Sequence, residues 1–331
     1  MQPMPCPSII ATAVLALSLA AAGSAGAADA PAAVADLRIR AAEQRPGAAN
    51  ASLLAAAHAG KRLVAVGERG TVLLSDDGGA SLRQAGQVPV AAQLTAVDFA
   101  DDRRGWAVGH WGAILRTDDG GNTWTLQRSD LQQDQPLLAV KALDAQRAVA
   151  VGLWSLVLVT QDGGQTWRTV TLPVQPGARK ADLNLYSLFA GPAGALYATA
   201  EQGKLLRSTD GGLAWQTLDT GYRGSLWAGL ALRDGSLLVG GLRGTLLRST
   251  NAGDSWQPVA TGQTSSITGL AQGPDGSITA SALDGLVLTS RDGQAFQARR
   301  SADRLSHTGV LVNPQGQMVL TTRAGVRSAL P

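Results

Sequence analysis

The sequence predicts an all-β protein, a seven-bladed β-propeller of four-stranded antiparallel blades. Three observations support this fold class: a short segment recurs six times at a nearly constant interval, runs of Val and Leu flank each copy, and 40 of the 331 residues are glycine. Glycine supplies tight turns, so a chain this rich in it is expected to form many short strands rather than long helices.

The recurring segment holds a Ser or Thr, then Asp and Gly, then a closing aromatic residue. Its copies are 42, 43, 48, 41 and 41 residues apart, and they begin at Ser75, Thr117, Thr160, Ser208, Ser249 and Ser290. Periods of about 40 to 50 residues are typical of propellers and of helical arrays. The repeat therefore narrows the fold to these two architectures.

The residues around each copy favour strands. Residues 63–67 and 71–74 are apolar runs of strand length separated by a glycine-containing turn, and they precede the first copy. A further run, such as residues 94–99, precedes each such pair, and another, such as residues 124–127, follows each segment. Four short antiparallel strands make one propeller blade.

The segment itself is interpreted as a structural turn between the third and fourth strands of a blade. Its Asp is expected to accept hydrogen bonds from backbone amides two residues on, the glycines to adopt left-handed angles, and the Trp to bury its ring. Calcium binding is the rival interpretation, but one Asp per turn is a poor ligand set for this ion. We call the six segments the box turns.

The repeats resemble a known family. Residues 105–109, Gly112 and residues 117–124 resemble the BNR or Asp-box propellers, and more closely the photosystem II stability and assembly factor family with its relatives in non-photosynthetic bacteria. The likeness runs from about residue 51 to the end. It implies a scaffold for a membrane complex and, in the non-photosynthetic relatives, association with export systems of the resistance-nodulation-division type. Asp boxes also occur in sialidases and other glycosidases.

Residues 51–331 are expected to form the seven blades. The seventh unit, around residues 318–328, has no box turn and lacks an outer strand. Within the N-terminal segment 29–50, residues 37–40 are predicted to supply that strand and close the ring, because an open ring would leave edges prone to pairing. The alternative is a linker at residues 29–50, with closure inside the last blade.

Residues 1–28 are predicted to be a cleaved signal peptide, with an apolar run at 8–22 and small residues at 23–28. A single membrane anchor is the alternative. The only cysteine, Cys6, lies in this segment, so the mature protein would have no thiol or disulfide. The expected location is periplasmic or secreted.

No catalytic, metal or cofactor site is predicted. The three histidines, His58, His110 and His307, are too scattered for a metal or serine triad, and there are only three glutamates after the signal. The net charge of +3 comes without a basic run, which argues against nucleic acid. The alternative function is a glycan-binding or sialidase-like glycoside hydrolase propeller.

Binding has more support than catalysis. The turns between the second and third strands should open on the face opposite the box turns and ring the mouth of the central channel. Exposed arginines beside aromatics are typical of interface anchors, although solvated turns with incidental arginines are the alternative. The predicted partner of this monomer is a protein, such as a membrane protein or an exporter component. The predicted binding residues are Arg69, His110, Trp111, Trp154, Arg243 and Arg323 in these turns, with Arg223 in a loop between blades.

Overall fold

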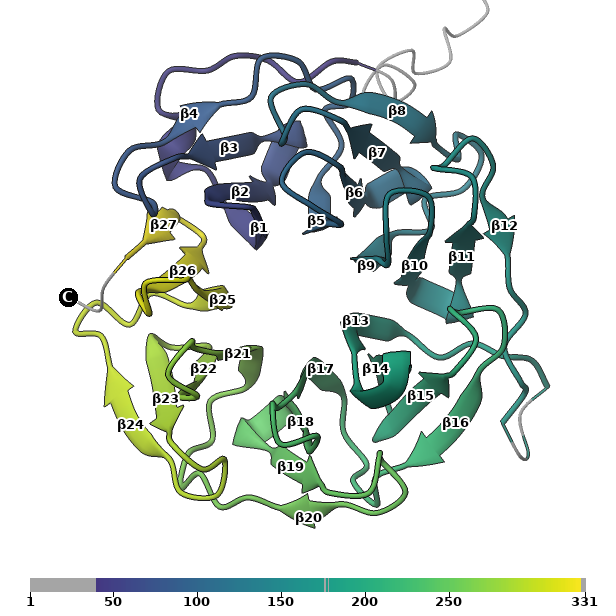
Figure 1. Ribbon diagram of the computed structural model, residues 1–331, viewed down its shortest axis with the longest axis vertical. Helices are drawn as coiled ribbons and strands as arrows, with labels where there is room; N and C mark the ends of the chain where they lie inside the picture. The colour runs from purple at the N-terminus through teal and green to yellow at the C-terminus, as the bar shows by residue number, and fades with distance from the viewer. Residues whose placement is uncertain (1–39, 176, 178, 329–331) are drawn as a thin grey trace, which may run out of the picture. The chain divides into compact units, whose positions relative to one another are not determined.

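The computed structural model describes residues 40–175, 177 and 179–328, and these form seven antiparallel sheets arranged in a ring around a central opening (Figure 1). Six sheets have four strands and the seventh has three. The predicted fold class is confirmed. The predicted signal peptide, residues 1–28, lies outside the described residues. No helix in the described part of the chain is long and apolar enough to cross a membrane.

The strands of each blade follow one another in chain order from the channel to the rim. Blades one to four are β1 (Leu53–Ala59), β2 (Arg62–Gly67), β3 (Val72–Ser75) and β4 (Arg83–Gln84); β5 (Leu94–Phe99), β6 (Gly105–Gly109), β7 (Ile114–Thr117) and β8 (Thr125–Arg128); β9 (Leu137–Ala142), β10 (Ala148–Gly152), β11 (Val157–Thr160) and β12 (Arg168–Thr169); and β13 (Leu185–Ala190), β14 (Leu196–Ala200), β15 (Lys204–Ser208) and β16 (Gln216–Asp219). Blades five to seven are β17 (Leu226–Ala231), β18 (Leu237–Gly241), β19 (Leu246–Ser249) and β20 (Gln257–Pro258); β21 (Ile267–Gln272), β22 (Ile278–Ala282), β23 (Leu286–Ser290) and β24 (Gln297–Arg300); and β25 (His307–Val312), β26 (Met318–Thr322) and β27 (Gly325–Arg327).

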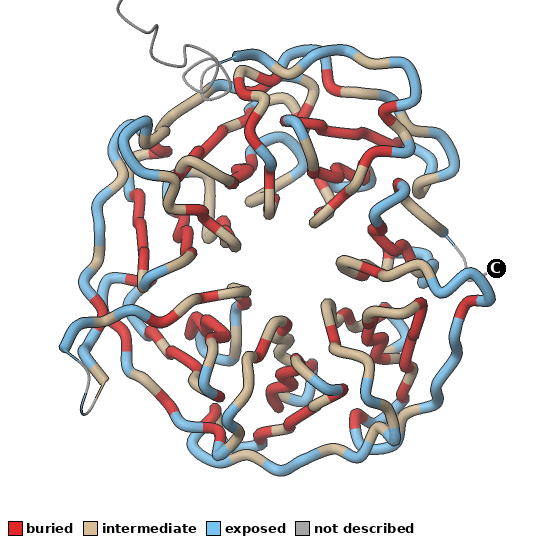
Figure 2. Tube along the Cα trace, turned by 180° about the vertical axis from the view of Figure 1, so that it is seen from behind, coloured by how far each residue is buried: buried red, intermediate tan, exposed pale blue. Residues whose placement is uncertain are grey.

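The core lies between neighbouring blades. Every residue of β6, β10, β14, β18 and β22, the second strands of blades two to six, is buried (Figure 2). A strand covered on both faces needs apolar or small side chains at every position, not at alternate ones. This explains why the second strands read as unbroken runs such as Ala-Val-Ala-Val-Gly in β10.

The box turns hold themselves together through side-chain hydrogen bonds. In blade two, the Thr117 hydroxyl accepts the Gly121 amide at 3.0 Å and donates to Asp119. Asp119 in turn accepts the amide and the hydroxyl of Thr123. The sequence-based expectation placed these amides two residues after the Asp, which is wrong for five of the six turns, where the accepted amide is four residues on. These are the turns at Asp77, Asp119, Asp162, Asp210 and Asn251.

The first and last blades meet directly. The Thr308 hydroxyl of β25 donates to the Leu53 carbonyl of β1 at 2.7 Å, and the Gly325 amide of β27 donates to the Ala51 carbonyl. Blade seven has three strands in the described residues, as expected from the missing outer run. Of the predicted closing strand, residues 37–40, only Arg40 is described. It lies in no strand and lines a surface pocket together with Arg69 of blade one.

Residues just after Arg40 follow the edge of blade one. The Ala42 amide donates to the Val88 carbonyl, and the Gln44 side chain donates to the Ala85 carbonyl. The chain then passes through the short 3-10 helix η1 (Ala48–Asn50), which contacts both β4 and β27. Residues 42–50 thus lead along blade one to its junction with the last blade.

Candidate functional site

The two faces of the ring carry different connections, because successive antiparallel strands alternate in direction. The hairpins between first and second strands lie beside the box turns, as shown by the hydrogen bond from the Gly120 amide to the Arg103 carbonyl. The turns between second and third strands lie beside the loops that lead to the next blade, as shown by the bond from the Ser155 amide to the Leu183 carbonyl. We call these the box face and the turn face.

The turns of the turn face share an unusual backbone. Four of them form short 3-10 helices, η2 (Glu68–Gly70), η3 (His110–Gly112), η4 (Leu153–Ser155) and η6 (Leu242–Gly244). Their middle residues are Arg69, Trp111, Trp154 and Arg243, and all have φ between 52° and 59°. Bulky residues rarely adopt this left-handed conformation. In these turns the sequence places a large side chain where glycine would fit with less strain.

The next blade holds several of these strained turns in place. The backbone amide of Trp111 donates to the Asp134 carboxylate at 2.6 Å, that of Trp154 to the Asn184 side chain, and that of Arg243 to the Ser266 hydroxyl. Sequence reasoning missed these acceptors. Asn184 and Ser266 directly precede the inner strands β13 and β21, so aligning the blades on those strands could have found them.

Five of the seven predicted binding residues are exposed on the turn face. Within the described chain, no carboxylate lies within ion-pair distance of the arginines among them, and the side chain of Trp154 is 46% exposed. The structure therefore brings exposed guanidinium groups and an indole to one face. The five residues are Arg69, Trp154, Arg223, Arg243 and Arg323.

His110 and Trp111 are less available. The Nδ1 atom of His110 lies 3.0 Å from Asp134 Oδ2, and the Trp111 side chain packs against the apolar core between blades one and two. Both are half-buried. Their environment indicates that they anchor their own turn at least as much as they present a surface.

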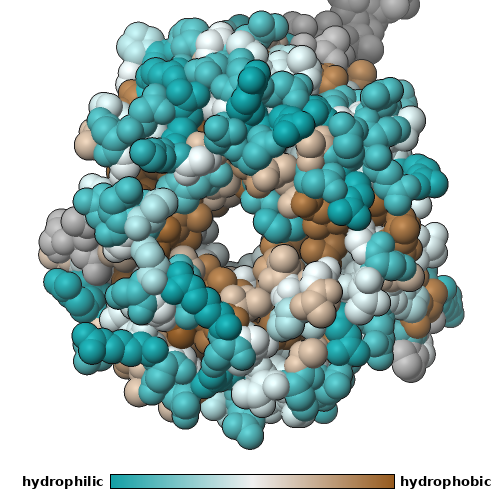
Figure 3. Space-filling view, in the orientation of Figure 1, coloured by the Kyte–Doolittle hydropathy of each residue, from teal (hydrophilic) through white to brown (hydrophobic). Residues whose placement is uncertain are grey.

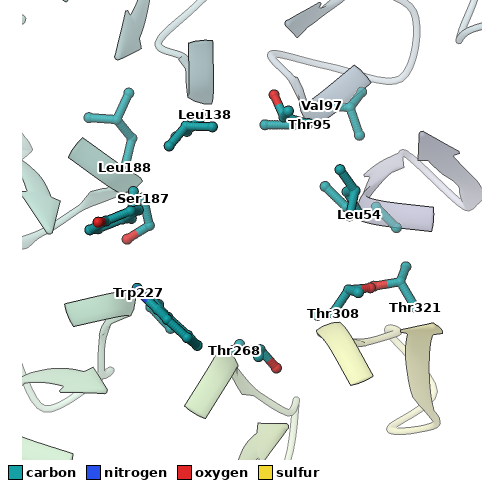
Figure 4. A pocket seen from close by; sticks show the side chains of 18 of the residues that line it. Leu54, Thr95, Val97, Leu138, Ser187, Leu188, Trp227, Thr268, Thr308 and Thr321 are labelled. Carbon is teal, nitrogen blue, oxygen red and sulfur yellow. The ribbon is translucent and has the colours of Figure 1, made fainter. Parts of the chain in front are cut away.

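None of the seven predicted residues is among those that line the cavity of the central channel. The turns lie between the second and third strands, and strands in a sheet are spaced about 4.8 Å apart. The channel is instead lined by the seven inner strands, and it encloses a cavity of about 650 Å³ (Figures 3 and 4). The predicted residues surround this opening at a greater radius.

The second residue of the inner strand is threonine in three blades and a larger residue in the other four. Thr95, Thr268 and Thr308 each donate a hydrogen bond to the carbonyl of the first inner-strand residue in the next blade. These hydrogen bonds join neighbouring blades. The equivalent residues of the other blades cannot make this bond and line the cavity with larger side chains, which are Leu54, Leu138, Tyr186 and Trp227.

One ion pair lies in the channel lining. Lys141 Nζ is 2.7 Å from Asp98 Oδ2, and the same carboxylate oxygen accepts the Ala142 amide. Asp98 is the single carboxylate among the described residues that line the cavity, and both of these contacts engage its Oδ2 atom. Within the described residues, no three His, Cys, Asp or Glu side chains gather as a metal ion would require.

Comparisons with solved structures agree with this fold. The structure "YCF48 bound to D1 peptide" matches with a TM-score of 0.68 and 20% identity, over 87% of this chain and 97% of that one. YCF48 from Cyanidioschyzon merolae matches with a TM-score of 0.68 and 18% identity, over 86% and 97%. The WD40 repeats of RRP9 match with a TM-score of 0.63 and 10% identity, over 86% and 90%. At these identities the likeness shows the fold alone.

Sequence comparison adds a family. No curated protein sequence matches the chain. A family model does match, that of the photosynthesis system II assembly factor YCF48, over residues 80–226, which span the end of blade one to the start of blade five. The resemblance that the repeats predicted is thereby confirmed: residues 80–226 carry the sequence pattern of the YCF48 assembly factor family, within a seven-bladed propeller.

Proposed function

We propose that this chain is an exported, non-catalytic assembly protein that binds a protein partner through its turn face. One observation carries the proposal: Arg69, Arg223, Arg243 and Arg323 project from four different places on that face, and no carboxylate of the described chain lies within ion-pair distance of them. A related propeller, YCF48, has been solved with a D1 peptide bound, which is consistent with peptide recognition by this fold.

The chemistry of the face suggests the kind of partner. A guanidinium group forms bidentate hydrogen bonds with a carboxylate, and arginine is enriched with tryptophan at the energetic centres of protein interfaces. An acidic segment of another protein would find four such groups here. We propose a membrane protein or an exporter component as the partner, with export supported by the signal-like residues 1–28.

A glycosidase function has less support. Glycoside hydrolysis generally needs two carboxyl groups facing each other across the substrate. The channel offers Asp98, which is occupied by Lys141 and the Ala142 amide. The family model that matches residues 80–226 is described as an assembly factor.

The test compares two charge-matched variants in affinity purification from detergent-solubilised membranes. One variant changes Arg69, Arg243 and Arg323 to Glu on the turn face. The control changes Lys61, Arg103 and Arg291 to Glu on the box face. We expect mass spectrometry to show a membrane protein that wild type and control retain and the turn-face variant loses. An identical set of partners for all three proteins would refute the proposal.

A further inference from the structure

We infer that the mouth of the channel is a second subsite on the turn face, which takes one apolar side chain from an acidic segment of the partner. The inference rests on the proposed function and adds the chemistry that the partner must have. The subsite lies between Leu138 of β9, Tyr186 of β13 and Trp227 of β17, which belong to three consecutive blades.

The position of these residues follows from the topology. Loops between blades lie on the turn face and lead into the inner strands, so each inner strand begins at that face. Leu138, Tyr186 and Trp227 are the second residues of their strands and therefore lie at the turn-face end of the channel. Leu188, two residues further along β13, is another apolar residue that lines the cavity (Figure 4).

The third residue of every inner strand is small, so the wall beneath this mouth is formed mostly by backbone. These residues are Ala55, Ala96, Ala139, Ser187, Ala228, Gly269 and Gly309. Their side chains face the neighbouring blades: Ala139 and Ala228 are buried in the cores between blades, and a Cβ on Gly269 would meet the Val310 amide nitrogen at 2.9 Å. Figure 3 shows the opening bordered by apolar residues. The volume of this open cavity, about 650 Å³, exceeds what one aromatic side chain occupies.

The wall is uneven in a way that selects an apolar occupant. On one side, the hydroxyls of Thr268 and Thr308 are already bound to backbone carbonyls, so they have no proton left to offer a ligand. On the other side, Leu138, Tyr186 and Trp227 are half-buried, which leaves apolar surface in contact with water. Concave sites with these properties gain most from burying apolar area.

The charges around the channel mouth indicate which residues should flank the apolar residue of the bound peptide. Among the channel residues at the first four positions of the inner strands, none is acidic, lysine or arginine. A charged side chain entering the mouth would lose its hydration without finding a counter-charge. The unpaired arginines lie further out on the same face. The fitting occupant is therefore a peptide with an apolar residue flanked by Asp or Glu.

The test measures fluorescence anisotropy with two labelled heptapeptides, Asp-Glu-Asp-Phe-Asp-Glu-Asp and the same peptide with Ala in place of Phe. We expect wild type to bind the Phe peptide roughly tenfold or more tightly than the Ala peptide. Trp227→Ala and Leu138→Ala should weaken the Phe peptide to the level of the Ala peptide and leave the Ala peptide unchanged. Leu213→Ala, which removes an exposed leucine from the box face, is the matched control.

A second kind of variant distinguishes loss of the subsite from misfolding of the protein. Leu54→Trp narrows the channel from blade one without removing an existing aromatic residue, and we expect it to exclude the Phe side chain as well. Equal affinity of the two peptides for wild type, with binding lost in Arg243→Glu, would overturn the subsite and leave the proposed face standing. Absence of binding by both peptides would overturn the subsite together with the proposed face.

Discussion

The box face and the turn face are built from connections of the same strands, yet they use polar side chains in opposite ways. On the box face, Ser75 and Asp77 bond to amides of their own turn, and the same pattern recurs in the other box turns. On the turn face, Arg69 and Arg243 make no comparable bond with their side chains, while the left-handed backbone beneath them carries the strain.

This difference shows where each kind of turn obtains its stability. A box turn is stabilised by residues within about eight positions of sequence, so it can be repeated with little change. The turns at Trp111, Trp154 and Arg243 depend on an acceptor from the next blade, as Trp111 does on Asp134. A turn whose shape is fixed by its neighbour leaves its own side chain free to vary, which is the property a binding surface needs.

The largest expected effect separates a box-turn tryptophan from a turn-face tryptophan. Trp124 is 1% exposed and donates from Nε1 to the Gly121 carbonyl, so Trp124→Ala should lower the free energy of unfolding by about 3 to 5 kcal/mol. Trp154→Ala should change it by far less, by about 1 kcal/mol or under, because this residue is already 46% exposed in the folded protein. Urea denaturation measures both, and similar losses would contradict the contrast between the faces.

A smaller effect is expected for the hydroxyl that organises a box turn. Thr117 is buried and its hydroxyl serves the Gly121 amide and the Asp119 carboxylate. Thr117→Ala should lower the free energy of unfolding by about 1 to 3 kcal/mol, because a buried amide loses its acceptor. Thr117→Ser keeps the hydroxyl, as Ser75 and Ser208 do elsewhere, and should recover most of the loss in the same measurement.

The box turns and the buried histidines should respond to different ranges of pH. Hydrogen bonds from the Thr166 hydroxyl and amide and from Thr160 lower the pKa of Asp162 to about 2. A carboxylate with a depressed pKa stabilises the fold above pH 3.8 and loses that contribution only as the pH falls through about 2. The stabilisation that the box turns provide should therefore persist as the pH falls to about 4.

Burial lowers the pKa of His58 and of His307, and within the described residues neither ring nitrogen of His58 has a hydrogen-bond partner. The unfolded chain then binds protons more readily than the folded one, so stability should fall as the pH drops below about 6.5. We expect His58→Leu to raise the unfolding temperature more at pH 5 than at pH 8. An equal change at both pH values would exclude this explanation.

The smallest effect is expected at the left-handed turns themselves. Arg243→Gly removes the strain of a positive φ but makes the unfolded chain more flexible, and these terms nearly cancel. The free energy of unfolding should change by less than about 0.5 kcal/mol. The neighbouring Gly244→Ala is the contrasting variant, since its Cβ would lie 2.1 Å from the Gln263 carbonyl oxygen and should destabilise the protein.

Local pattern was enough to predict several features correctly. The repeat around Thr117 and Trp124 determined six blades of four strands and the turns that carry Arg69 and Arg243, and the paired runs at residues 318–328 indicated the seventh blade. Each of these depends on contacts between residues close in sequence, or on the burial of a whole strand, and both leave a visible pattern in the chain. The resemblance to the YCF48 assembly factor family rests on the same repeat.

Tertiary structure alone decided how the blades meet. The hydrogen bond from the Thr308 hydroxyl to the Leu53 carbonyl joins residues 255 positions apart, and no local sequence pattern predicts it. The same holds for Asp134 beneath Trp111 and for the channel that Leu138, Tyr186 and Trp227 share. Side chains of one blade acquire these partners only when the blades pack against one another, and the first and last blades meet only when the ring closes. The sequence therefore determined the blades and their turns, whereas the packing of the blades into a ring decided which side chains line the channel and which remain exposed on its face.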